Sequence, residues 1–348
     1  MRDTAAKIAV VLMNLGGPVG PESIRPFLES LFGDPAILPL PGPLRRPLAW
    51  ILASARLRTA KAHYALIGGG SPLLEETMSQ AIALKTELLM LLDAADVEVF
   101  IAMRHAPPST GATAIDVSEF EPDHVVLLPL YPQFSTTTTA SSLSAWQAMY
   151  TGPGENHPIC CWYDNPGLVE AHAELIDRTW KAAGSPKVRL LFSAHGLPKS
   201  VIEGGDPYQW QVEATSARVG EYLGSSWDWQ VCYQSRVGPM KWLAPSTPQA
   251  IAQAAEDGVG VLIDPIAFVS EHVETLVELD YDYRRLAGKL GVRPYLRVPA
   301  VGTSATLIAG LARAVVAALG RHVEGPDGVF CPTRFGRCGR DRVQETAR

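Results

Sequence analysis

Three strand-like segments of the first half of the chain recur, in the same order, in the second half. Each is a short apolar run that ends in polar residues, glycine or proline. The matching pairs are 10–18 with 190–198 (VVLMNLGGP and LLFSAHGLP), 100–108 with 231–239 (FIAMRHAPP and VCYQSRVGP), and 125–135 with 261–270 (VVLLPLYPQFS and VLIDPIAFVS). Self-similarity of this kind predicts two structurally similar halves.

The apolar runs are rich in β-branched residues, and segments of helical character separate them, which is typical of parallel βαβ units. We therefore predict an α/β fold of two similar domains, each a parallel sheet flanked by helices. The expected domains are residues 1–160 and 161–300, followed by a part, 301–348, in which a helix packs back and a cysteine-containing tail follows. The predicted strands are 8–15, 97–103, 124–130, 188–193, 230–234 and 260–266.

The first half contains an insertion that the second half lacks. Gly16 and Arg104 lie 88 positions apart, whereas their counterparts Gly196 and Arg236 lie only 40 apart. The additional residues are about 18–70.

Residues 36–62 of the insertion carry five basic side chains, no acidic ones and many apolar ones. This pattern favours either of two structures. One is an apolar lip with a cationic rim, which would contact a greasy anionic ligand or the surface of a membrane. The other is an ordinary helical hairpin whose basic side chains extend to water along the surface.

The composition limits the classes of function. The chain has 348 residues, 47% of them hydrophobic, and a net charge of −6, which gives no general reason to expect a nucleic-acid partner. No apolar run is long enough to span a membrane, and the N-terminus lacks a signal-peptide cleavage pattern. We expect a soluble, cytoplasmic monomer or homodimer, with peripheral membrane contact through 36–62 as the one membrane interaction.

Polar and ionisable residues are concentrated directly after the predicted strands. In doubly wound sheets, ligands bind beyond the carboxyl ends of the strands. The residues at these positions are 14–17, 104–105, 131–135, 193–196 and 234–236, together with the segment 268–272.

His195 and an acidic segment are the sharpest candidates for chemistry. Residues 268–283 hold five carboxylates and no lysine or arginine, and three of the acids, Glu274, Glu278 and Asp282, are spaced by four. Like charges at that spacing on a helix repel, which indicates a cation or a proton to be handled. One imidazole with carboxylates suits a divalent first-row metal or proton transfer. The alternatives are a hydrogen-bonded loop histidine and acids that favour the first turn of a helix.

The spacing of the three acids also carries a structural prediction. On an ideal α-helix, positions four apart drift by about 40° at each step. Glu274, Glu278 and Asp282 would align better on a wider helix of π type, which tends to occur at functional sites.

Five cysteines are present, at 160, 161, 232, 331 and 338. An odd number without a signal peptide argues against a disulfide framework. Cys232 lies in an apolar strand and is expected in the core. The other four could supply a thiolate metal or iron–sulfur site, or they could remain reduced and unpaired.

Taken together, several of these motifs closely resemble ferrochelatase. They follow one another in that family's order across residues 8–283. The matching segments are 14–18 (NLGGP), 67–72 (IGGGSP), 128–135 (LPLYPQFS), 193–198 (SAHGLP), 234–240 (QSRVGPM) with Trp242, and 268–282.

The resemblance implies a lyase that inserts ferrous iron into protoporphyrin IX to form protohaem, the final step of haem biosynthesis. It also implies two Rossmann-like domains with the porphyrin between them, and residues 36–62 as the lip where porphyrin enters. By motif position, His195 and Glu274 would be catalytic, and Glu278 and Asp282 would extend a metal-binding line from them. The implied porphyrin-contacting residues are Leu15, Arg104, Tyr131, Ser135, Trp242 and His272.

The resemblance leaves several alternatives open. Coproporphyrin III is an alternative substrate, and a non-catalytic porphyrin- or haem-binding protein and a chelatase for a reduced tetrapyrrole are alternative functions. Some family members hold a [2Fe–2S] cluster, whose ligands here would be Cys160, Cys161, Cys331 and Cys338. Adjacent cysteines rarely reach one cluster together, so we do not expect Cys160 and Cys161 both to contribute.

Overall fold

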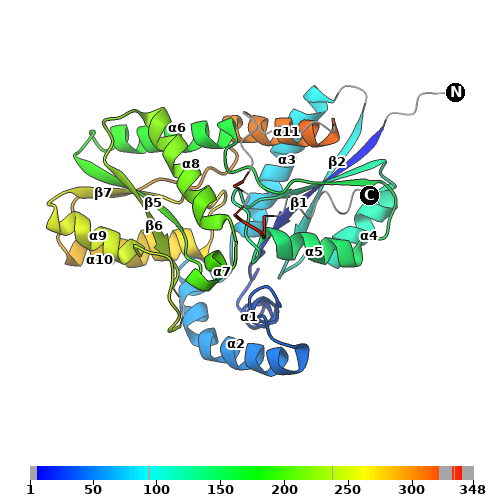
Figure 1. The fold of residues 1–348 in the computed structure, drawn as a ribbon, viewed down its shortest axis with the longest axis horizontal. Helices are drawn as coiled ribbons and strands as arrows, with labels where there is room; N and C mark the ends of the chain where they lie inside the picture. The colour runs from blue at the N-terminus through cyan, green and yellow to red at the C-terminus, as the bar shows by residue number, and fades with distance from the viewer. Residues whose placement is uncertain (1–5, 93–94, 237, 321–330, 333, 339–348) are drawn as a thin grey trace.

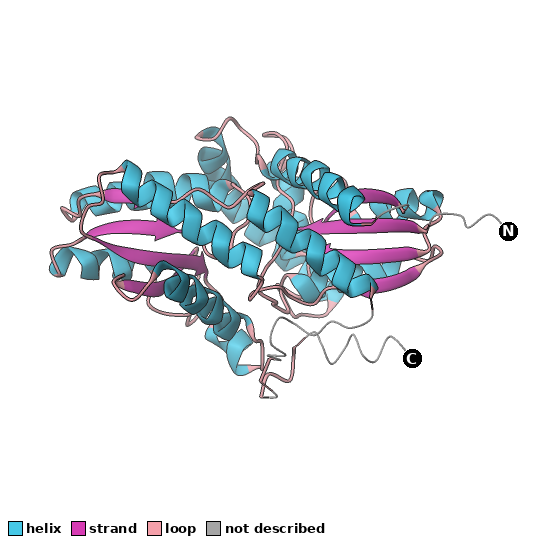
Figure 2. Cartoon of the chain, turned by 90° about the horizontal axis from the view of Figure 1, so that it is seen from above, coloured by secondary structure: helices cyan, strands magenta, loops and turns pink. Residues whose placement is uncertain are grey.

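The computed structural model shows two α/β halves, each built on a four-stranded parallel sheet (Figure 1). It describes residues 6–92, 95–236, 238–320, 331–332 and 334–338. The two sheets lie toward opposite ends of the molecule, and helices cover both faces of each (Figure 2). Continuous apolar strands are expected in such sheets because neither face meets water.

The first sheet has the strand order β2-β1-β3-β4 and all its pairs are parallel. All but the first residue of β1 are buried, which explains its unbroken apolar run. The strands are β1 (Lys7–Asn14), β2 (Asp96–Met103), β3 (His124–Pro129) and β4 (Glu155–Pro158).

The second sheet repeats this order strand for strand, as β6-β5-β7-β8. The prediction of two similar halves from the recurring segments is therefore confirmed. All six predicted strands are present, but β4 and β8 were missed because these edge strands are too short to show a pattern. The strands of this sheet are β5 (Val188–His195), β6 (Trp229–Gln234), β7 (Gly260–Asp264) and β8 (Tyr295–Arg297).

One apolar core runs beneath helices that cover a face of both sheets. It joins Leu12 of β1 to Phe192 of β5 through the helices α3 (Leu73–Leu91), α6 (Pro166–Ala182), α8 (Tyr208–Leu223) and α11 (Ala305–Leu319). Helix α11 packs against both α3 and α6. The opposite faces are covered by α4 (Thr110–Phe120) and α5 (Thr139–Met149) on the first sheet, and by α9 (Thr247–Glu256) and α10 (Arg284–Lys289) on the second.

The insertion forms a helical hairpin of α1 (Ile24–Phe32) and α2 (Gly42–Ala65), which protrudes from one side of the molecule (Figure 1). Gly68 has φ +93°, a left-handed conformation that favours glycine, and it turns the chain back. The amide of Ser71 then donates to the carbonyl of Pro18 at 2.7 Å, so the insertion leaves and returns at one point. None of the helices in the described part of the chain combines the length and the apolar character that a membrane span needs.

The loop after β3 ties the two halves together. The amide of Phe134 donates to Gln211 of α8 at 2.6 Å. Asp206, which lies between α7 (Lys199–Glu203) and α8, accepts from the hydroxyl of Ser135 and the amide of Thr136 at 3.0 and 2.7 Å. Because Asp206 is fully buried, these bonds form a fixed connection between the halves.

Candidate active site

His195 and Glu274 meet at the centre of the candidate site. Nδ1 of His195 lies 2.9 Å from Oε2 of Glu274. His195 is the last residue of β5, so the strand runs two residues further than the predicted 188–193, and Glu274 begins the helix η1 (Glu274–Tyr283). The two residues come together because the carboxyl ends of β5 and β7 share one edge of the sheet. The side chain of His195 is 37% exposed, so its ring remains accessible to a ligand.

The backbone after His195 is held closely. A Cβ at Gly196 would lie 2.8 Å from the carbonyl oxygen of Gln234, so a larger residue would force the two strand ends apart. The same Cβ would lie 3.4 Å from the ring of Trp242, which places that ring directly beside the His195 loop. On the other side, the hydroxyl of Tyr208 donates to the carbonyl of His195 at 3.1 Å.

The predicted π-helix is confirmed, because residues Glu274–Tyr283 form one. Thr275 and Leu279 are fully buried on its inner side, whereas Glu274, Glu278 and Asp282 are only half-buried. The wider winding therefore separates the line of three acids from the side of the helix that packs into the core.

The remaining two acids of the segment have a structural partner. Arg297 of β8 forms ion pairs with Glu271 and Asp280, and Arg284 also pairs with Asp280. The five carboxylates therefore divide into two neutralised by arginine and three that lie along η1 without an arginine or lysine ion pair among the described residues.

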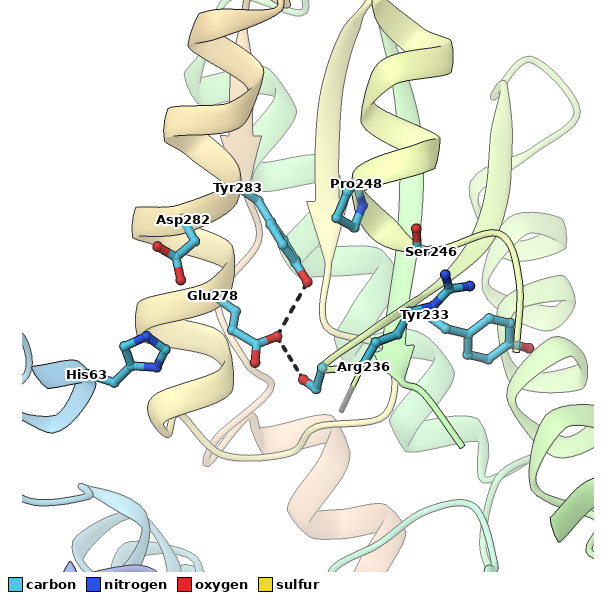
Figure 3. A pocket seen from close by; sticks show the side chains of 9 residues that line it. His63, Tyr233, Arg236, Ser246, Pro248, Glu278, Asp282 and Tyr283 are labelled. Carbon is cyan, nitrogen blue, oxygen red and sulfur yellow. Dashed lines mark hydrogen bonds between the residues drawn. The ribbon is translucent and has the colours of Figure 1, made fainter. Parts of the chain in front are cut away.

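A pocket of about 290 Å³ borders the outer part of this line (Figure 3). Glu278 accepts from the hydroxyl of Ser235 at 2.7 Å and lies 3.5 Å from the hydroxyl of Tyr283. His63, at the end of α2, lines the same pocket as Glu278 and Asp282. No local pattern connects His63 with the acids, because only the folding of the insertion brings α2 to η1.

The three ionisable groups nearest the centre have shifted pKa values. Burial lowers the pKa of His195, but the charge and hydrogen bond of Glu274 outweigh it, so the net pKa is raised. Burial opposes ionisation of Glu274 as well, yet the charge of His195 holds its pKa well below the usual range. Burial, and then the negative charge of Glu274, raise the pKa of Glu278 to about 7. Neighbouring carboxylates thus differ in protonation near neutral pH, which is typical of functional sites.

His272, which was predicted to contact porphyrin, lies beside the pair of His195 and Glu274. Its Nε2 is 3.6 Å from Oε2 of Glu274, and its ring packs against Phe268. Glu274 is therefore flanked by two imidazoles.

Three predicted porphyrin contacts lie at the carboxyl ends of the first sheet. Leu15 follows β1, Arg104 follows β2, and Tyr131 lies just beyond β3; each is partly buried. Arg104 is held by Asp34, whose Oδ2 lies 2.8 Å from Nη2, and its side chain remains 22% exposed. Burial raises the pKa of Tyr131, so its hydroxyl stays neutral.

Ser135, a further predicted porphyrin contact, is not brought to the site. It is 1% exposed and its hydroxyl is hydrogen-bonded to Asp206. The serine and threonine residues after β3 hold buried carboxylates of the chain itself, since Ser141 likewise donates to Asp34. The polar residues after β3 that suggested a ligand contact therefore serve, at Ser135, to connect the two halves.

Comparison with known proteins identifies the fold and the motifs. The profile of the ferrochelatase family matches residues 7–319. The chain is 53% identical over 334 residues to the ferrochelatase of Phenylobacterium zucineum, covering 95% of this chain and 97% of that one. It is 54% identical over 336 residues to the ferrochelatase of Caulobacter vibrioides, covering 96% of each. The chain belongs to the ferrochelatase family.

Among solved structures, SirB from Bacillus subtilis with Fe3+ is similar in fold, with a TM-score of 0.50 and 12% identity. The superposition covers 90% of this chain and 95% of the SirB chain. At that identity the likeness concerns the fold alone.

The four cysteines other than Cys232 come together in this ferrochelatase family member. Each thiol contacts two others in a ring that runs from Cys160 to Cys161, Cys331, Cys338 and back. Gln211 donates to the sulfur atoms of Cys161 and Cys331 at 3.4 and 3.1 Å. Cys160 and Cys161 both belong to this ring, although adjacent cysteines were expected to reach one cluster together only rarely.

This ring fits a four-thiolate site. Contact with Cys161 and Cys338, and then burial, raise the pKa of Cys331 well above its ordinary value. Four thiolates at such short range would repel one another without a cation among them. Four cysteine thiolates are the donor set of a [2Fe–2S] cluster.

Proposed function

We propose that this protein inserts ferrous iron into protoporphyrin IX to form protohaem, the last step of haem biosynthesis. The observation that carries the proposal is the contact of His195 with Glu274, from which Glu278 and Asp282 continue along a π-helix. A protein that only binds porphyrin would not need a line of carboxylates that repel one another.

Metal insertion removes two protons from pyrrole nitrogens and places iron on the ring nitrogens. Nδ1 of His195 is bound to Glu274, so Nε2 is the atom available to accept a proton. The raised pKa of His195 favours proton transfer to it, and the carboxylate of Glu274 stabilises the imidazolium that results. We assign proton removal to His195 and electrostatic support to Glu274.

The outer acids are suited to handling the cations. Asp282 and Glu278 line the pocket beside η1, and Glu278 lies between Asp282 and Glu274 in the line. Carboxylates are ligands for hydrated divalent ions, and an acid with a pKa of about 7 exchanges protons readily at neutral pH. We assign iron delivery and proton release to this line, with His63 at its outer end.

The porphyrin would lie beside His195, against residues that end strands in both halves. Trp242 adjoins the His195 loop, and Leu15, Arg104 and Tyr131 follow strands of the first sheet. The partly exposed guanidinium of Arg104 suits a propionate of the porphyrin. Residues 1–160 and 161–300 would then be the two domains that hold the ring between them.

The lip supports protoporphyrin over coproporphyrin III, and contact with a membrane surface. Helix α2 exposes Leu44, Trp50 and Ile51, each by more than half of its surface. Protoporphyrin carries vinyl groups at positions where coproporphyrin carries further charged propionates, so it gains more from apolar side chains. The same exposed side chains, with the basic residues of 36–62, suit the interface of a membrane.

We further propose that Cys160, Cys161, Cys331 and Cys338 hold a [2Fe–2S] cluster. The ring of thiols supplies the required number of ligands, and the shared hydrogen-bond donor Gln211 is suited to thiolate sulfur. When bound, such a cluster would join the tail to the loop after β4; we assign it no step of iron insertion.

The activity is tested with anaerobically purified protein, ferrous iron and either protoporphyrin IX or coproporphyrin III. We expect repeated turnover of protoporphyrin to haem, followed by the change in the visible absorption bands, and a lower kcat/KM for coproporphyrin. Porphyrin binding in a one-to-one ratio without turnover would reject the enzymatic function. Faster turnover of coproporphyrin would reject only the substrate preference.

A further inference from the structure

Three metal-ligand side chains meet at the end of the first sheet that lies away from the chelatase site. His124 is the first residue of β3, and Glu155, the first residue of β4, is its direct partner in register. His157 lies two residues further along β4 and therefore on the same face as Glu155. One ligand atom of each residue lies within 4.8 Å of the other two.

The distances approach those of a coordinated ion. Nδ1 of His124 lies 3.1 Å from Nε2 of His157, and Oε2 of Glu155 lies 4.0 Å from the same Nε2. Two nitrogens bound tetrahedrally to zinc at 2.0–2.1 Å would lie about 3.3–3.4 Å apart. The imidazole nitrogens are close to this separation already, and only the carboxylate of Glu155 must move inward.

The surroundings suit a site that is anchored on one side and open on the other. The side chain of His157 is 9% exposed, so its position is fixed by packing. The side chain of Glu155 is 50% exposed, which lets it rotate toward an ion and leaves room for water as a further ligand. Without an ion, the same contact can be explained as one hydrogen bond between the two imidazoles.

We propose that His124, Glu155 and His157 bind a divalent first-row transition metal ion, with zinc as the best match. Two imidazoles and one carboxylate with an open position are a ligand set of zinc sites, and imidazole favours zinc over calcium or magnesium. The site is separate from the acids of η1, which lie beyond the carboxyl ends of the second sheet.

Such an ion would fasten the short edge strand β4 to β3. Cys160 lies three residues after His157 and Cys161 four, so the strand that the ion holds leads directly into the proposed thiolate site. Binding to the folded state alone would also stabilise that state in proportion to occupancy.

The test is an anaerobic zinc titration of metal-free, full-length protein in competition with a chromophoric chelator, without porphyrin. We expect His124→Gln/His157→Gln to bind one equivalent of zinc fewer than the wild type and to keep its chelatase activity. We expect Glu155→Gln to weaken the same equivalent by about tenfold or more. His195→Ala is the matched control, because it removes an imidazole far from this site and should therefore retain this equivalent. Cobalt should report the same site through visible absorption bands of tetrahedral coordination.

Unchanged zinc stoichiometry and affinity in His124→Gln/His157→Gln would overturn the proposal. Should circular dichroism show that this double variant does not fold, Glu155→Gln decides, since a half-exposed side chain can be replaced without disturbing the core. Wild-type zinc affinity in Glu155→Gln would then overturn it.

Discussion

At the residue scale, the partners of the acids in the segment 268–283 separate those that hold the fold from those that face the site. Glu271 and Asp280 are paired with Arg297, while Glu274 is paired with His195. Carboxylates that look equivalent in the sequence therefore have different consequences when they are removed. Loss of Glu271 or Asp280 leaves the guanidinium of Arg297 without one of its two carboxylates, whereas loss of Glu274 changes the surroundings of the site imidazole.

We expect His195→Ala and Glu274→Gln each to lower kcat by about 10²–10⁴-fold, the range that a general acid or base contributes. Their melting temperatures should stay close to that of the wild type, because both side chains face the accessible part of the site. Steady-state iron insertion and thermal unfolding measure the two effects. Wild-type rates in both variants would contradict the assigned mechanism.

Asp282→Asn and Asp280→Asn form a matched pair, identical in chemistry and two positions apart. Asp282→Asn should raise KM for iron with little change in stability, because Asp282 lines the pocket and has no arginine or lysine ion pair among the described residues. Asp280→Asn should lower the free energy of unfolding by about 1–3 kcal/mol and leave KM for iron unchanged, because it breaks charged hydrogen bonds to Arg297. The reverse assignment of effects would contradict the division of the acids.

At the scale of elements, the site depends on how closely strand ends approach and on where the insertion lies. The carboxyl ends of β5 and β6 meet at Gly196, and α2 brings His63 to η1. Neither relation is local in sequence, so changes far from His195 can displace it.

Gly196→Ala should lower both stability and kcat. Its Cβ would lie 2.8 Å from the carbonyl of Gln234, so the strand ends must shift, at a cost of about 1–3 kcal/mol. Gly288→Ala in α10 is the control, because nothing lies within 4 Å of its added Cβ. That change should be neutral or stabilise by about 0.5–1 kcal/mol. Equal behaviour of the two variants in thermal unfolding and turnover would show that the close approach is unimportant.

Trp50→Ser/Ile51→Ser should reduce cosedimentation with anionic lipid vesicles, because it removes apolar surface that α2 exposes. Ile82→Ser on α3 is the matched control, since Ile82 is 68% exposed on a different helix. Equal loss of vesicle binding in both proteins would assign the effect to general surface hydrophobicity. No loss in the double variant would contradict membrane contact through the lip.

At the scale of the whole molecule, the halves are joined by a shared core, by Asp206, and by the meeting of Cys331 and Cys338 with Cys160 and Cys161. The last of these contacts links residues far apart in the chain. A cluster that stayed bound there would close a long loop and so reduce the conformational entropy of the unfolded chain.

Cys331→Ser should abolish acid-labile sulfide and the visible charge-transfer absorption of the purified protein, and it should lower the melting temperature. Cys232→Ser should keep both signals, because Cys232 is buried in β6 and lies outside the ring. The measurement is made on anaerobically purified protein. Wild-type protein without iron or sulfide would reject the cluster.

Much of the fold could be predicted because it depends on patterns that extend over a few neighbouring residues. The six longer strands were found from apolar runs, and the order of the second sheet follows from its likeness to the first. The edge strands β4 and β8 were missed, because strands of four and three residues carry no periodicity. Ser135 was predicted to contact the ligand because it follows a strand end. A polar residue at that position can equally well form a buried hydrogen bond between the halves, and the sequence pattern does not distinguish the two roles.

Patterns along the chain were enough to predict the two similar halves, the insertion, the positions of His195 and the acidic line, and the π-helix. These follow from spacing and alternation, which act over a few residues. Three relations arise only when the chain folds: Arg297 neutralises Glu271 and Asp280, His63 lines one pocket with Glu278 and Asp282, and four cysteines meet. Those relations depend on which distant segments pack together, and burial and neighbouring charge then set the pKa values on which the chemistry rests.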